Sequence, residues 1–172
     1  MVDDTAGAIA PSPARGRGAG RGRLNIEPAM TRVDFYVLSE EGTDVRLRYA
    51  CRLAEKAVDH GLRVYVQTAS LTEAQRLDEL LWTFSDRSFL AHEIANGAAP
   101  SHPKVMVLVG DGEAPPDYRQ VLVNLTDRLP PSIELYERIA EIVDTDPERK
   151  RLSRERYKHY REQGCALETH NL

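Results

Sequence analysis

The chain has 172 residues, of which 41% are hydrophobic and 29% charged, a composition typical of one soluble globular domain. A chain of this length buries roughly two-thirds of its surface on folding, so it needs no disulfide framework. Cys51 and Cys165 lie too far apart in the sequence for zinc-site spacing. No apolar run approaches the ~20 residues of a membrane helix. The N-terminal arginines are not followed by the apolar core of a secretory signal, so we expect a cytoplasmic protein that does not contact membranes.

Charge is distributed unevenly along the chain. The net charge is −4, but residues 31–148 carry 12 basic and 21 acidic side chains, a balance of −9. Residues 149–172 carry seven basic and three acidic side chains, a balance of +4. An acidic body with a basic C-terminal end predicts two different partner surfaces.

Residues 1–29 are predicted to form a disordered leader, because the alternating Gly/Arg run at 14–23 has no apolar period with which to bury a core. Three interpretations of this leader stay open. It is a solvated tail, or an upstream extension of a coding frame that starts at Met30, or a weak contact for nucleic-acid phosphates. The folded domain is expected to span residues 30–172.

From residue 32 onward, strand and helix signals alternate. Residues 32–38 are β-branched and aromatic, which predicts a strand. Thr43 or Asp44 is expected to cap a helix that ends at Gly61 and shows the 3.6-residue apolar period of a half-buried helix. Its apolar residues are Leu47, Ala50, Cys51, Ala54, Ala57 and Val58.

Three further strands are predicted at residues 63–67, 104–109 and 120–125. The capping box from Ser70 to Glu73 starts a second helix that runs to about Trp82. A third helix is expected after Pro130-Pro131-Ser132, with Ile133, Tyr136, Ile139, Ala140 and Val143 on one side. Asp146 and Pro147 then begin a final helix as N-cap and first helical residue, and this helix ends near Gln163.

Alternating strands and helices predict a three-layer α/β/α domain with a mainly parallel sheet, Rossmann-like in architecture. The C-terminal helix is expected to pack against it as an appendage. Gly110 and Gly112 follow a strand, where a phosphate loop would lie. They lack a third glycine and precede Pro115-Pro116, so a plain loop is the better interpretation and no nucleotide cofactor is expected.

Catalytic and metal-binding patterns are not found in the sequence. The five histidines have neither i, i+4 spacing nor adjacent cysteines, so no metal site is predicted. Cys51 falls on the apolar side of its helix and is expected to be a buried hydrophobe. No nucleophile-elbow or Ser/His/Asp pattern is present. We therefore expect a binding protein rather than an enzyme.

The C-terminal helix carries a cationic stripe. Lys150, Arg154 and Lys158 recur at i, i+4 and i+8, Arg161 continues the line, and Tyr157 lies beside it. Like charges at this spacing destabilise an isolated helix by a few tenths of a kcal/mol per pair. Three interpretations remain. The stripe is a solvated face, or a contact for nucleic-acid phosphates, or a site for an acidic peptide with an apolar pocket beside it.

The opposite side of that helix carries Leu152, the stem of Arg156, and Tyr160, which are expected to dock on the sheet. A second candidate surface surrounds Trp82, the only tryptophan of the chain, with Phe84 and Phe89 nearby in the sequence. These aromatic residues form either an exposed patch for a protein partner or a cap over the core.

In the C-terminal helix and around Trp82, the sequence resembles the chi subunit of the bacterial DNA polymerase III holoenzyme. The likeness covers about residues 31–172, in family order. It rests on Phe35–Leu38, Arg76–Trp82, Ser88–Phe89 with His92, Leu122–Leu125 with Pro130, Ala140–Asp144, and Arg154–Lys158 with Tyr160 and Arg161. The leader lies outside the family pattern, and Leu90-Ala91 stands where many members have a proline before the histidine.

The resemblance implies a non-catalytic accessory subunit within a polymerase assembly. Family members form a heterodimer with the psi subunit, which ties them to the clamp loader, and they bind the acidic C-terminal tail of the single-stranded-DNA-binding protein. Carried over by position, the tail-binding residues are Val143, Lys150, Arg154, Tyr157 and Lys158. Trp82 and Phe89 match the face that meets psi or a helicase-type competitor. DNA contact would then be indirect.

Two rival interpretations remain for the sequence. One is a nucleotide-binding or enzymatic domain that uses the α/β sheet. The other is a protein that binds single-stranded DNA directly through the Gly/Arg leader and the basic helix.

Overall fold

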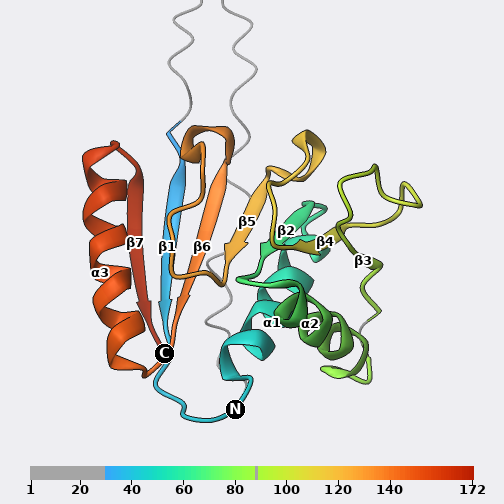
Figure 1. Ribbon diagram of the computed structural model, residues 1–172, viewed down its shortest axis with the longest axis horizontal. Coiled ribbons are helices and arrows are strands. Elements are labelled where there is room, and N and C mark those ends of the chain that lie inside the picture. Colours follow the sequence, from blue (N-terminus) through green and yellow to red (C-terminus); the bar gives the residue numbers. More distant parts are fainter. Residues whose placement is uncertain (1–29, 88) are drawn as a thin grey trace, which may run out of the picture.

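A computed structural model describes residues 30–87 and 89–172, so the predicted leader at 1–29 lies outside the described residues. Seven parallel strands form one sheet in the order β3-β4-β2-β5-β6-β1-β7 (Figure 1). The strands are β1 (Arg32–Val37), β2 (Val64–Gln67), β3 (His92–Ile94), β4 (Val107–Gly110), β5 (Val121–Asn124), β6 (Arg138–Val143) and β7 (Ala166–Asn171).

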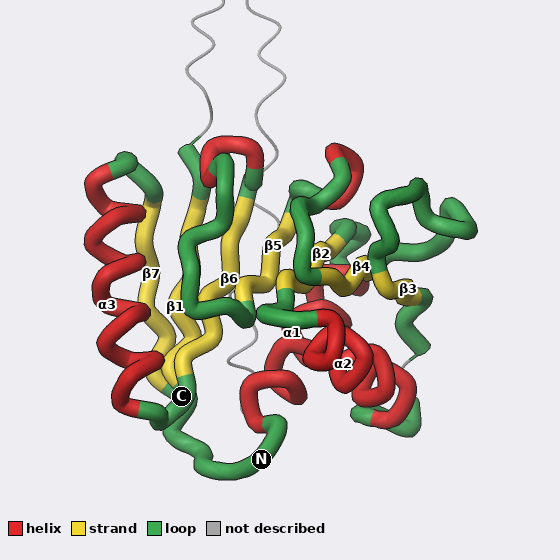
Figure 2. Tube along the Cα trace, in the orientation of Figure 1, coloured by secondary structure: helices red, strands yellow, loops and turns green. Residues whose placement is uncertain are grey.

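Three α-helices cover the two faces of this sheet: α1 (Val45–Asp59), α2 (Leu71–Thr83) and α3 (Pro147–Glu162). Short 3₁₀ helices lie at Pro116–Tyr118 and Ile133–Leu135. No helix in the described part of the chain is both long and apolar enough to cross a bilayer. Figure 2 shows α1 and α2 packed together at one end of the sheet and α3 beside β7 at the other.

Alternating strand residues divide the core into two apolar clusters. Tyr36, Ala140 and Ile142 pack with the apolar sides of α1 and α2. Phe35 and Val143 belong to the opposite cluster, with Tyr160 of α3. Side chains of successive strand residues point to opposite faces, so one strand serves both layers. The predicted three-layer α/β/α architecture is confirmed.

The helix starts follow the predicted capping chemistry in two of three cases. Ser70 Oγ accepts a hydrogen bond from the Glu73 backbone N–H at 3.2 Å, and Asp146 Oδ1 accepts one from the Arg149 N–H at 2.8 Å. Asp44 holds the N-cap position of α1, but its side chain does not cap the helix. Its carboxylate pairs with Arg76 at 2.6 Å instead, so the predicted cap is wrong in its chemistry.

The predicted helix after Pro130 is wrong. Residues 133–135 form a single 3₁₀ turn, and Arg138–Val143 form the fully buried strand β6 between β1 and β5. A parallel strand covered on both faces is apolar throughout rather than alternating. Its apolar residues at 139, 140, 142 and 143 therefore also match a helical period. Val143 consequently ends a strand, not a helix.

Besides β6, two strands were not predicted, β3 and β7, and both lie at edges of the sheet. β7 changes the role of the last helix. Because α3 connects β6 to β7 across β1, it is a crossover helix of the fold rather than an appendage. Its end matches the prediction, with Gln163 as C-cap and Gly164 at a φ of 79°.

The loop after β4 follows the prediction of a plain loop. A side chain at Gly110 would place its Cβ 2.7 Å from the Tyr65 hydroxyl, so the glycine makes room for that ring. The same hydroxyl donates a hydrogen bond to the Gly112 carbonyl at 2.9 Å. These glycines therefore have a structural role in packing. Cys51 is fully buried, as predicted.

Candidate functional site

A pocket of about 510 Å³ lies between α3 and the strands beneath it. All five residues that the sequence analysis assigned to tail binding line this pocket: Val143, Lys150, Arg154, Tyr157 and Lys158. The sequence therefore predicted a set of residues that the fold brings together. The other lining residues are Phe35, Val37, Ser153, Arg161 and Thr169.

The floor of the pocket is apolar. β1 and β6 run in parallel register with Val37 opposite Val143, so the ends of both strands contribute to it. Val143 and Phe35 are only 3% and 4% exposed. The Phe35 and Tyr157 rings lie 5.3 Å apart at 56°, a geometry favourable for aromatic pairs. This surface can accept an apolar or aromatic ligand group.

The rim of the pocket is cationic. Lys150, Arg154, Lys158 and Arg161 form no ion pair within residues 30–87 and 89–172. The neighbouring Arg151 on α3, in contrast, is paired. Arg151 pairs with Glu148 at 2.6 Å and with Glu155 at 2.7 Å. The helix thus neutralises the cation that points away from the pocket and leaves the four around the pocket available to an anion.

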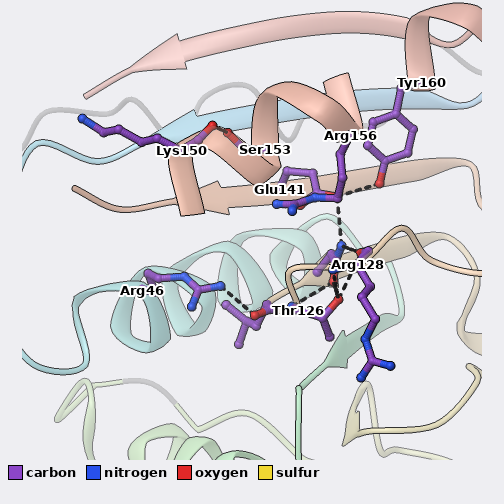
Figure 3. A network of polar contacts seen from close by, with 10 residues as sticks. Arg46, Thr126, Arg128, Glu141, Lys150, Ser153, Arg156 and Tyr160 are labelled. Carbon is purple, nitrogen blue, oxygen red and sulfur yellow. Dashed lines mark hydrogen bonds and ion pairs between the residues drawn. The ribbon is translucent and has the colours of Figure 1, made fainter. Parts of the chain in front are cut away.

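A buried polar network fixes which side of α3 faces the pocket (Figure 3). Glu141 of β6 is fully buried and accepts hydrogen bonds from the Tyr160 hydroxyl at 2.6 Å and from Asn124 Nδ2 at 2.9 Å. Arg156 Nη2 lies 3.2 Å from the same carboxylate. Burial raises the pKa of Glu141, and Arg156, Tyr160 and Asn124 act in the opposite direction.

The side chains of α3 therefore form two sets, one that points toward the sheet and one that faces the pocket. Arg156 and Tyr160 point inward, as predicted, although Arg156 is held by its guanidinium as well as by its stem. Arg154 and Lys158 are exposed at the pocket, and Tyr157 is half-buried beside them. In Figure 3, Lys150 extends away from the buried network. The inward set holds the helix, and the outward set is free to bind.

A second surface lies on the other helical layer. Trp82 at the end of α2 is 57% exposed and Phe89 is 76% exposed, with ring centroids 5.7 Å apart. Of the two interpretations left open, these exposures support a surface patch rather than a cap over the core. Phe84 does not share this exposure, because it is half-buried against the core. We call Trp82 and Phe89 the aromatic patch.

Two other polar sites fit a ligand less well. A cavity of about 260 Å³ at the carboxyl ends of the strands is lined by Asp44, Glu73 and Asp144 against Arg46 and Arg149. Three carboxylates beside two guanidiniums do not favour a nucleotide phosphate. On β1 and β7, the ligand atoms of Asp34, Glu168 and His170 gather within 4.8 Å of one another.

Arg32 already occupies the cluster of Asp34, Glu168 and His170. Arg32 Nη2 lies 2.6 Å from Glu168 and 3.2 Å from Asp34, and His170 Nε2 lies 3.0 Å from Asp34. The group is an ion-pair network that joins β7 to β1. A metal ion there would have to displace the guanidinium that already bridges both carboxylates.

Sequence reasoning missed four lining residues of the pocket: Phe35, Val37, Ser153 and Thr169. Phe35 and Val37 belong to a predicted strand, but which of its faces meets α3 depends on the sheet order. Thr169 lies on β7, whose polar sequence carries no strand signal. Residues 33–37 read Val-Asp-Phe-Tyr-Val, which is too uniformly apolar to show which of these side chains face α3.

Comparison with known proteins identifies the family of the chain. The family profile described as "DNA polymerase III chi subunit, HolC" matches residues 30–168. DNA polymerase III subunit chi of Pseudomonas aeruginosa is 39% identical over 143 residues, which cover 83% of this chain and 98% of that protein. The Haemophilus influenzae protein of the same name is 31% identical over 138 residues, 80% of this chain and 95% of its own.

DNA polymerase III subunit chi of Escherichia coli is 28% identical over 144 residues, 81% of this chain and 97% of its own length. The family profile thus spans nearly all the described residues, and each relative covers at least 80% of the chain. The chain belongs to the DNA polymerase III chi subunit family.

Proposed function

We propose that this chi-family chain is a non-catalytic replication accessory subunit that bridges two proteins. The pocket on α3 binds the acidic C-terminal tail of the single-stranded-DNA-binding protein, and the aromatic patch binds psi, which connects to the clamp loader. The observation that carries the proposal is the pocket itself, an apolar floor surrounded by cations that form no ion pair in the part of the chain that the structure describes.

The chemistry of the pocket matches such a tail, a run of acids that ends in Pro-Phe with a free carboxylate. Arg154 is suited to pair with the terminal carboxylate through two parallel hydrogen bonds. Lys150 and Lys158 attract the preceding acids over a longer, salt-screened range. Val143 and Tyr157 contact the phenylalanine ring and the proline, and Phe35 extends that apolar floor.

The arrangement of the two surfaces supports simultaneous binding. β3 and β7 are the opposite edges of the sheet, separated by six inter-strand spacings, or roughly 29 Å. The aromatic patch adjoins β3, and the pocket lies beside β7. A partner bound at one of these two surfaces therefore leaves the other uncovered, which is what a bridging subunit requires. A helicase-type protein that used the aromatic patch would compete with psi and not with the tail.

The proposal assigns DNA an indirect role. Outside the basic C-terminal region, residues 31–148 have a balance of −9, which repels a polyanion. A direct single-stranded-DNA contact through residues 1–29 and α3 would appear as oligonucleotide binding without any partner protein. The proposed function needs neither a cofactor nor a membrane and places the protein in the cytoplasm with the replication machinery.

A pull-down tests the proposal. Immobilised chain is mixed with full-length single-stranded-DNA-binding protein or with the same protein lacking its C-terminal tail. We expect retention of the full-length protein alone, and equal retention of both forms would contradict tail binding. A thermal-shift series with nucleotides addresses the rival enzymatic interpretation, because a ligand that binds the native state raises the melting temperature.

A further inference from the structure

The indole of Trp82 rests on a buried histidine. The ring centroids of Trp82 and His92 lie 4.7 Å apart at 60°, and the His92 side chain is 0% exposed. Phe89 lies 5.7 Å from Trp82. One part of the indole is thus supported from within by β3, while more than half of the residue remains exposed to a partner.

His92 is itself held through one ring nitrogen. Nδ1 lies 2.6 Å from the Leu90 carbonyl. Nε2 lies 3.2 Å from Oδ1 of Asp78 but makes no hydrogen bond within residues 30–87 and 89–172. Asp78 precedes Trp82 by one turn on α2, so the same helix supplies the carboxylate and the indole beside the ring. The His92 ring is therefore fixed by Nδ1 and by the groups packed around it.

We propose that His92 is the positioning residue of the aromatic patch: its buried ring, fixed beside Leu90 and Asp78, holds Trp82 in the orientation that the protein partner binds. The inference rests on the proposed docking of psi at this patch. A surface indole without such support would lose side-chain freedom on binding, and a fixed orientation reduces that entropic cost.

The surroundings of His92 keep its ring in one place. Asp78 and Trp82 of α2 lie beside the ring, and the residue paired with His92 on β4 is the apolar Val107. A ring enclosed in this way can support the indole without moving itself. Loss of the ring should therefore free Trp82 and weaken binding to psi.

Trp82 is the only tryptophan, so its fluorescence reports on this contact alone. The first measurement compares fluorescence anisotropy and acrylamide quenching in the wild type, His92→Ala, and His60→Ala, an exposed-histidine control. We expect lower anisotropy and stronger quenching only in His92→Ala, together with an affinity for psi that is about tenfold weaker. Wild-type anisotropy and psi affinity in His92→Ala would overturn the proposal.

A second variant keeps the test decisive if His92→Ala is poorly folded by circular dichroism. His92→Leu fills much of the same buried space but removes the flat ring beside the indole. The proposal predicts lower Trp82 anisotropy and weaker psi binding in this variant. The proposal is overturned if His92→Leu keeps the wild-type anisotropy and the wild-type affinity for psi.

Failure of the docking assignment is distinguishable from failure of this inference. If Trp82→Ala leaves psi affinity unchanged, psi does not bind at the aromatic patch and the proposed function is wrong at this surface. The fluorescence comparison of the wild type with His92→Ala would still decide whether His92 orients Trp82, because that readout needs no partner.

Discussion

The hydroxyl of Tyr160 donates a hydrogen bond of 2.6 Å to Oε1 of Glu141, and both side chains are fully buried. Tyr160 lies on α3 and Glu141 on β6, so this bond joins the helix to the sheet. It also fixes the rotation of α3 about its axis, because Arg156, one turn earlier, contacts the same carboxylate. The cations of the pocket face outward as a consequence.

Removing this hydroxyl should destabilise the fold. Tyr160→Phe leaves a buried carboxylate with one donor fewer, and we expect the free energy of unfolding to fall by about 1–3 kcal/mol. Urea denaturation measures the change. Tyr157→Phe is the matched control, because the Tyr157 side chain is half-buried and makes no hydrogen bond within the described residues. Equal effects of the two substitutions would show that the Tyr160–Glu141 bond is not a stabilising contact.

The two lysines of the pocket should act through long-range attraction. Lys150→Gln and Lys158→Gln are each expected to weaken binding of the acidic tail peptide by about two- to fivefold at low salt, and by less at high salt, where charges are screened. Titration of the peptide at several salt concentrations gives the slope of log Kd against log salt. A slope that stays the same in both variants would mean that neither lysine contributes to the attraction.

The two cysteines should differ sharply in reactivity. Burial raises the pKa of the Cys51 thiol to about 12, so almost none of it is thiolate at neutral pH, and the side chain is inaccessible in the folded state. Burial also raises the pKa of Cys165, but that residue is partly exposed. A disulfide exchange reagent should therefore modify Cys165 first and Cys51 only on unfolding. Mass spectrometry of the labelled peptides checks the order, and early modification of Cys51 would place it outside the core.

Loss of the exposed indole should affect binding more than stability. Because Trp82 is 57% exposed, Trp82→Ala is expected to change the free energy of unfolding by under about 1 kcal/mol. The same substitution should weaken psi binding by about tenfold or more, as for an aromatic anchor. Denaturation and titration are measured on the same preparation. A large loss of stability would indicate that Trp82 belongs to the core.

Much of the fold could be predicted from local signals. Capping residues placed the starts of α2 and α3, and apolar periodicity placed α1. The region 133–143 could not be assigned in this way, because β6 is buried on both faces and its pattern also matches a helix. A charged residue such as Glu141 is also rare inside a buried strand, so nothing in the local sequence marks it as part of the core. Its partners Asn124, Arg156 and Tyr160 come from separate elements and are brought together only by folding.

The candidate site was predictable to the extent that it lies on one helix. Lys150, Arg154, Tyr157 and Lys158 share α3, so their spacing sets their common direction. Phe35 and Thr169 come from β1 and β7, and only the strand order places them against that helix. His92 could not be linked to Trp82 from the sequence, since β3 is a three-residue edge strand without a clear signal.

The central claim is that the cationic pocket on α3 binds the acidic C-terminal tail of the single-stranded-DNA-binding protein. Calorimetric titration of the tail peptide into the wild type, Arg154→Ala and Arg151→Ala tests it most directly. Both arginines are exposed on α3, but Arg151 is paired with Glu148 and Glu155, whereas Arg154 lines the pocket.

We expect Arg154→Ala to weaken peptide binding by roughly 1–3 kcal/mol and Arg151→Ala to leave it close to the wild-type value. Equal affinity of all three proteins for the peptide would contradict the assignment of the pocket.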